Sequence, residues 1–149
     1  MRRPGWTLVL ALVASFAVSA CSGGTTEDTE PPAEGVVLRV VVDGKVAVDW
    51  TLADLEADVP FVDLVIDGDE QNGPLLTAVL AASGVSEWES GEVIGMGEGR
   101  IFAVGLDISV AEINDGWIFD VTNKGSLKLA SADLPREQWV RDVGEIAFP

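Results

Sequence analysis

The hydrophobic positions at the start of the ordered part of the chain predict a β-hairpin. Residues 36–42 (VVLRVVV) are nearly all β-branched and apolar on both faces, which is typical of a buried strand. Asp43-Gly44 is a strong signal for a two-residue hairpin turn. Residues 46–50 then alternate, with Val46, Val48 and Trp50 on one face, so we expect them to return as the partner strand.

The following stretch predicts a helix, a strand and a second helix. Thr51 can cap a helix over residues 51–57, and Asp54 can reach back to complete a capping box. Residues 61–66 form an apolar strand, which an acidic turn follows. We expect Asn72-Gly73-Pro74 to open the second helix, with Pro74 at its first position, and Gly84 to end it. The apolar stripe of that helix consists of Leu75, Leu76, Val79 and Leu80.

The second half of the chain predicts further short strands joined by turns. The expected elements are a strand over residues 91–96, a turn at Glu98-Gly99, a strand over 101–106, a helical turn within 107–113, strands over 117–121 and 126–129 joined at Asn123-Lys124-Gly125, and a terminal strand over 145–148. Together these make about seven strands and two or three short helices. The pattern therefore predicts a single, sheet-dominated α+β domain over residues 35–149.

The first 34 residues read as an export signal and a tether. Arg2 and Arg3 precede a short apolar run, and a small-residue cleavage site ends at Ala20, directly before Cys21. We expect residues 1–20 to be a lipoprotein signal peptide and Cys21 to be lipidated, which would anchor the protein to the extracytoplasmic face of the cell membrane. An uncleaved anchor is the alternative, but the apolar run is short for a span. Residues 22–34 contain no large apolar side chain and predict a disordered tether.

Charge and residue types exclude several kinds of function. Removal of residues 1–20 leaves seven basic and 25 acidic residues, a net charge of −18, which argues against nucleic acid as a partner. The acidic balance favours solubility, and it also suits a cationic partner. The chain contains no histidine, and its only cysteine is Cys21. Histidine-based catalysis, a cysteine nucleophile, a disulfide and a thiolate metal site in the domain are therefore all excluded.

The densest polar cluster lies in residues 67–73, between the predicted strand and the second helix. Asp67, Asp69 and Gln71 have the alternate spacing of a calcium loop, but the glycine falls one place late and Ala78 stands where an EF-hand has its final glutamate. The cluster is either a solvated turn or an irregular cation site. We expect Asp67, Asp69 and Asn72 to line a ligand pocket, with Arg100 facing them from the following hairpin.

Basic and aromatic side chains of the second half allow two interpretations. Five basic residues could converge on an anionic group such as a pyrophosphate, or each could neutralise a nearby acid. These are Arg100, Lys124, Lys128, Arg136 and Arg141. Among the tryptophans some must fill the core, whereas Trp88, between Glu87 and Glu89, is expected at the surface as a contact site.

The order TLADL, strand, loop, NGP-LL-x-x-VL-x-x-x-GV resembles the molybdopterin-binding-like domains of the sulfite oxidase superfamily. The resemblance covers residues 36–148 and includes the Asn123-x-Gly125 turn and Trp139-Val140 ahead of the terminal strand. It implies a sulfite-oxidase-type fold and, in catalytic members, a metal-ligating cysteine that would fall within residues 66–69. This sequence has no cysteine there.

The resemblance and the missing cysteine together suggest a non-catalytic binding module for a small ligand, a cation or an envelope protein. No cofactor is expected, although the resemblance makes molybdopterin possible. Two alternatives stay open: a molybdopterin-dependent oxidoreductase, or a subunit of one, and a purely structural envelope lipoprotein.

Overall fold

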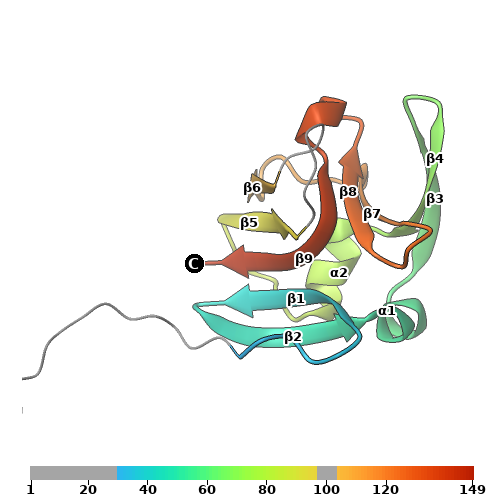
Figure 1. Cartoon of the computed structure of the whole chain (residues 1–149). Helices are drawn as coiled ribbons and strands as arrows, with labels where there is room; N and C mark the ends of the chain where they lie inside the picture. The colour runs from blue at the N-terminus through green and yellow to red at the C-terminus, as the bar shows by residue number, and fades with distance from the viewer. Residues whose placement is uncertain (1–29, 97–103) are drawn as a thin grey trace, which may run out of the picture.

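The computed structural model describes residues 30–96 and 104–149, and strands dominate it (Figure 1). Two short α-helices, α1 (Leu52–Asp58) and α2 (Leu76–Ala82), and a single 3-10 turn, η1 (Arg136–Gln138), accompany nine strands in this part of the chain. The strands are β1 (Val36–Val42), β2 (Lys45–Thr51), β3 (Phe61–Ile66), β4 (Asp69–Pro74), β5 (Ser90–Gly95), β6 (Gly105–Ser109), β7 (Trp117–Val121), β8 (Leu127–Ser131) and β9 (Val140–Phe148). The predicted sheet-dominated α+β class is confirmed.

The first hairpin forms as predicted. Val42 of β1 pairs with Lys45 of β2, which leaves Asp43 and Gly44 as a two-residue turn. Their φ angles are 51° and 70°, the positive values that the turn requires and that aspartate and glycine tolerate. A register shift lies between Val40 and Val41, and the start of β2 is exposed, so Val46 lies at the surface while Trp50 is buried.

Strand β9 is the centre of the seven-stranded sheet. Its last four residues run parallel to β1, with Val42 opposite Phe148, and the same segment runs antiparallel to β5. Its first residues pair instead with β8, with Val140 opposite Leu129. Asp142 has a φ of 48° where the strand changes partners, and Figure 1 shows that β9 is curved. The predicted terminal strand was therefore correct in position but too short.

Helix α1 is also confirmed, including its cap. The Thr51 hydroxyl accepts a hydrogen bond from the Asp54 amide at 3.2 Å, and Asp54 accepts one from the Thr51 amide at 3.3 Å. This reciprocal pair satisfies two amide groups that would otherwise have no helical partner. Leu55 is the residue of α1 that is fully buried.

The predicted opening of the second helix is wrong. Residues 69–74 form strand β4, whose last residue, Pro74, pairs with Phe61 of β3. Helix α2 begins later, with Leu75 at its N-cap and no side-chain cap, although Gly84 ends it with a φ of 76°, as expected. Leu76, Val79 and Leu80 are buried as predicted, whereas Leu75 is half-buried and forms a β-bridge with Ile118.

The remaining elements follow the prediction in order but not in every boundary. Strand β6 begins at Gly105, so Asp107 belongs to a strand, and the expected helical turn is reduced to residues 110–112. The Glu98-Gly99 turn and the first half of the predicted 101–106 strand lie outside the described residues. Strand β7 has its predicted bounds, and β8 begins and ends slightly later than expected, after a turn in which Gly125 has a φ of 76°.

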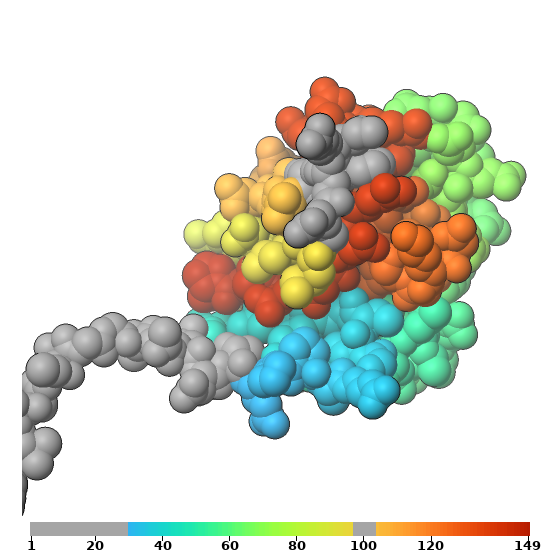
Figure 2. Space-filling model, in the orientation of Figure 1, coloured from blue at the N-terminus to red at the C-terminus, as the bar shows by residue number. Residues whose placement is uncertain are grey.

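The core lies between the sheet and the two helices, and one glycine fixes how the β3–β4 hairpin joins it. A side chain at Gly73 of β4 would place its Cβ 1.9 Å from the carbonyl oxygen of Phe119 on β7, so only glycine permits this approach. A second cluster of buried side chains, Ile66, Ile118, Ala130 and Trp139, fills the space behind the hairpin. In Figure 2 the β7–β8 hairpin fills the surface between β9 and the β3–β4 hairpin.

Candidate functional site

The predicted acidic loop is the tip and the second strand of the β3–β4 hairpin. Asp67 and Gly68 form its two-residue turn, with φ angles of 53° and 85°. Asp69 and Asn72 lie on β4, opposite Ile66 and Asp63 of β3. The structure therefore places Asp67, Asp69 and Asn72 along one hairpin, while Arg100 lies outside the described residues.

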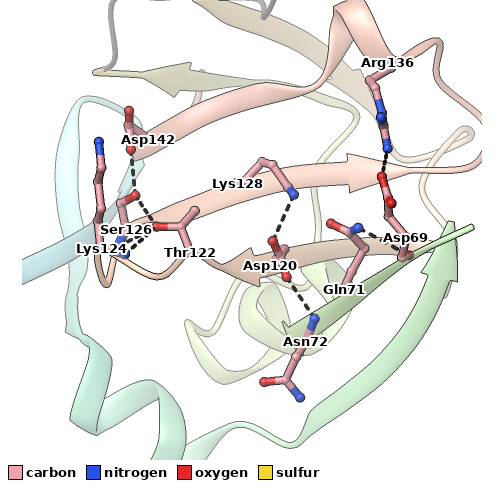
Figure 3. A network of polar contacts seen from close by, with 10 residues as sticks. All are labelled: Asp69, Gln71, Asn72, Asp120, Thr122, Lys124, Ser126, Lys128, Arg136 and Asp142. Atoms are coloured by element: carbon pink, nitrogen blue, oxygen red, sulfur yellow. Dashed lines mark hydrogen bonds and ion pairs between the residues drawn. The ribbon is translucent and has the colours of Figure 1, made fainter. Parts of the chain in front are cut away.

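Asp69 is paired with a base that is distant in sequence. Arg136 of η1 forms an ion pair with the Asp69 carboxylate, and both side chains are about half exposed, at 47% and 59%. Arg136 also lies over the indole of Trp139, with 5.0 Å between Cζ and the ring centroid. The Nζ of Lys128 lies 5.5 Å from the same centroid. Two of the five basic residues thus lie near the Trp139 ring, and Figure 3 shows Arg136 reaching Asp69.

Asp120 of β7 connects the hairpin to the main sheet. One carboxylate oxygen accepts a hydrogen bond from the backbone N–H of Asn72 at 2.9 Å, and the other lies 2.9 Å from the Nζ of Lys128. The Asp120 and Lys128 side chains are only 15% and 18% exposed, so water screens this pair less than the Asp69–Arg136 pair. The Asn72 side chain donates to Asp63 at 2.6 Å. Both Lys128 and Arg136 therefore neutralise nearby acids, as one of the two interpretations expected.

Gln71 lies between these two ion pairs and is 2% exposed (Figure 3). Its Nε2 donates weakly to the backbone carbonyl of Asp69 at 3.4 Å, and its Oε1 has no hydrogen-bond partner among the described residues. A buried acceptor without a partner is unfavourable. From the sequence, Gln71 was considered part of a possible cation cluster but not of the ligand pocket, and Asp120 was not singled out. The alternation of exposed and buried residues in β4 marks Gln71 as inward-facing, but only the fold brings β4 to β7.

A second ion pair, on the β1–β2 hairpin, changes the pKa of both partners. Arg39 Nε and Nη2 donate to the two Asp49 oxygens at 2.7 and 2.8 Å, and Nη1 donates to the backbone carbonyl of Glu30. These hydrogen bonds raise the pKa of Arg39 and lower the pKa of the Asp49 carboxyl. Arg39 is 5% exposed, so the last residues of the predicted tether contact the domain through a largely buried cation.

Hollows of the described surface cluster around Trp88 and the end of β9. Trp88 is half-buried and meets Phe148 edge-on, with ring centroids 5.1 Å apart. It borders an apolar hollow of about 200 Å³ and an acidic hollow of about 350 Å³. A larger hollow of about 580 Å³ adjoins the second and contains Glu92, Asp107 and Glu145. The predicted surface role of Trp88 is thus compatible with its position, although one edge of the ring packs inward.

The residues present do not fit a molybdenum centre. The positions where the resemblance would set a thiolate ligand are the end of β3 and the Asp67-Gly68 turn, and the only cysteine of the chain is Cys21. Carboxylates are harder ligands than a thiolate. The two bases nearest the hairpin, Lys128 and Arg136, are already paired with carboxylates, which weakens their attraction for a pyrophosphate.

Within residues 30–96 and 104–149, no three or more aspartate, glutamate, cysteine or histidine side chains gather to hold a metal ion. No helix in these ranges is long and apolar enough to cross a membrane.

Fold and contacts together define an α+β domain with a central curved strand and an appended two-stranded hairpin. A scan of the sequence against protein-family models finds no matching family, and a search of curated proteins finds no similar sequence.

Proposed function

We propose that this protein is a lipid-anchored, extracytoplasmic binding module that uses a sulfite-oxidase-type domain without metal chemistry. In this proposal residues 1–20 direct export and Cys21 carries the lipid. The domain then binds a cationic ligand or a positively charged region of an envelope protein outside the cell membrane.

The acid-lined hollows beside the end of β9 are the observation that carries the binding role. Glu92 and Asp107 lie directly opposite each other on β5 and β6, and both line the 580 Å³ hollow together with Glu145. Like charges placed opposite each other on adjacent strands destabilise a sheet. A cation that binds between them reduces this repulsion. The relief of the repulsion adds to the free energy of binding a cationic partner.

The charge network of the β3–β4 hairpin supports the non-catalytic part of the proposal. Lys128 and Arg136 are satisfied by Asp120 and Asp69, and together they enclose Trp139. Such a network holds the hairpin against the sheet, which is a structural role. The sulfite-oxidase-type fold itself rests on the resemblance of residues 36–148.

Replacement of the lipidation residue tests the anchor. Since acylation needs the thiol, Cys21→Ser is expected to give an unprocessed precursor or a domain released into the soluble fraction, with an unchanged circular dichroism spectrum. Cell fractionation and mass measurement of the N-terminal peptide report the outcome, and Ser22→Ala is the matched control. A Cys21→Ser protein that is still processed and membrane-bound would show that the anchor is not this lipid.

Metal analysis of protein purified from its native membrane tests the non-catalytic role. We expect no stoichiometric molybdenum and no pterin absorbance. Stoichiometric molybdenum would replace the proposal with a molybdopterin-dependent oxidoreductase or a subunit of one.

A further inference from the structure

The loop between α2 and β5 places an aromatic ring between two hollows of opposite character. Trp88 lines both the 200 Å³ hollow and the 350 Å³ hollow. Its ring also contacts Phe148 edge-on, and Phe148 itself is 4% exposed. The ring is therefore held in place before any partner binds, which lowers the entropic cost of a contact.

The first hollow is almost entirely apolar. Its wall combines side chains of α2, the following loop and the turn after β6: Thr77, Leu80, Ala81, Val85, Val110 and Ile113, with Trp88. Val110 is 51% exposed, although it is an aliphatic side chain beside an aromatic one. The hollow is large enough for one aliphatic side chain, and burial of such a side chain against Trp88 is favourable.

The second hollow and its continuation are acidic. Asp43, Glu87 and Glu89 line the 350 Å³ hollow together with Trp88. Ser90, Phe148 and Pro149 are shared with the 580 Å³ hollow, which adds Glu92, Asp107 and Glu145. Among the described residues that line these three adjoining hollows, none is lysine or arginine. We call this continuous feature, from Val110 past Trp88 to Glu145, the Trp88 groove.

We infer that the Trp88 groove binds an extended, basic segment of a partner protein. In this complex one leucine-like side chain enters the apolar hollow, and flanking lysine or arginine side chains lie over Trp88 and the six carboxylates. An ammonium or guanidinium group over an indole is attracted to its ring face, and the carboxylates add a long-range attraction. The inference rests on the proposed binding role and specifies the site and the chemistry of the partner.

Charge decides between a basic segment and the other possible occupants. A second copy of this chain brings the same excess of acids to the groove, so like charges oppose a dimer through this face. A single small cation would occupy only one of the hollows, whereas a segment of several residues spans them all. Both the apolar and the acidic parts of the groove then contribute to binding.

The experiment is a fluorescence-anisotropy titration of three labelled seven-residue peptides with the full-length protein purified in detergent. The first peptide has two leucines among lysines and arginines, the second replaces the leucines by serine, and the third replaces the bases by glutamate. We expect the first to bind best, the second to bind more weakly and the third not to bind.

Two matched pairs of variants locate the site. Glu87→Gln with Glu89→Gln removes two charges in the groove, and Glu56→Gln with Glu70→Gln removes two exposed charges on α1 and β4. We expect the first pair to weaken binding by about tenfold and the second by less than about twofold, because close charges act more strongly than the general field. Val110→Ser should remove the preference for leucine, whereas Val65→Ser, which changes an even more exposed valine on β3, should not.

Each outcome has one consequence. Equal losses for the two glutamate pairs, binding of the glutamate peptide, or a dimer that depends on Val110 in the absence of peptide would overturn the inference. Loss of peptide specificity with Cys21-dependent membrane association intact would leave the lipid-anchored binding module in place and remove only this site. If Cys21→Ser stays processed and membrane-bound while the peptides bind as expected, the lipid anchor is removed and the Trp88 groove is kept.

Discussion

Asp49 is the carboxylate whose charge the fold most clearly stabilises. It accepts two hydrogen bonds from Arg39, which is 5% exposed and also donates to Glu30. The fold lowers the pKa of Asp49, so its contribution to stability is fully present above the unfolded pKa of about 4. The contribution is lost as the pH falls through the lower, folded-state pKa.

We therefore expect Asp49→Asn to lower the free energy of unfolding at pH 7, because it leaves the Arg39 guanidinium without its anionic partner. The difference between wild type and variant should shrink as the pH falls below about 4. Urea unfolding at pH 7 and at pH 3 measures it, with Glu70→Gln as the exposed control. A difference of the same size at both pH values would contradict the role given to this pair.

At the scale of single elements, α2 shows how burial decides the cost of a substitution. Leu80 is 3% exposed and Thr77, one turn earlier, is half-buried and makes only a long contact of 3.5 Å with Asp115. We expect Leu80→Ala to cost about 2 to 5 kcal/mol, as buried leucine deletions do, and Thr77→Ala to cost under about 1 kcal/mol. Equilibrium unfolding in urea compares them, and similar costs would place the buried face of α2 elsewhere.

The two Asp-Gly hairpins show what local sequence can and cannot predict. Asp43-Gly44 lies between runs rich in valine, so both its strands were predicted. Asp67-Gly68 forms the same kind of turn, but the strand after it reads DEQNGP, whose residues have low strand propensity. Strand β4 exists because β3 pairs with it and because Gly73 lets it approach β7, and the second of these contacts depends on residues that are distant in sequence.

In the candidate site, too, the local sequence predicted contacts between chain neighbours but not contacts between distant residues. Sequence alone placed Asp67, Asp69 and Asn72 together, since they are neighbours in the chain. It did not predict that Asp69 pairs with Arg136, 67 residues away, or that Asp120 and Lys128 complete the network. Periodicity reveals which face of an element is buried, but it carries no information about which distant element covers that face.

For the molecule as a whole, the excess of acids should set the response to salt. The chain carries a net charge of −16, which becomes −18 if residues 1–20 are removed as proposed, and mutual repulsion of that size opposes a compact state. We expect the melting temperature to rise as sodium chloride increases to about 0.5 M, since screening weakens repulsion between exposed charges. Differential scanning calorimetry, with sucrose of equal osmolality as the control, measures this. A fall in melting temperature with salt would indicate that the surface ion pairs outweigh the repulsion.

The position of β9 in the sheet also governs when this chain can fold. Strands β1, β5 and β8 all pair with residues 140–148, and the parallel pairing joins residues about a hundred positions apart. Contacts that span so much of the chain form slowly, and during synthesis they must wait until the last strand has left the ribosome. A chain that stays unfolded until then can still pass through a secretory channel, which the proposed export of this protein requires.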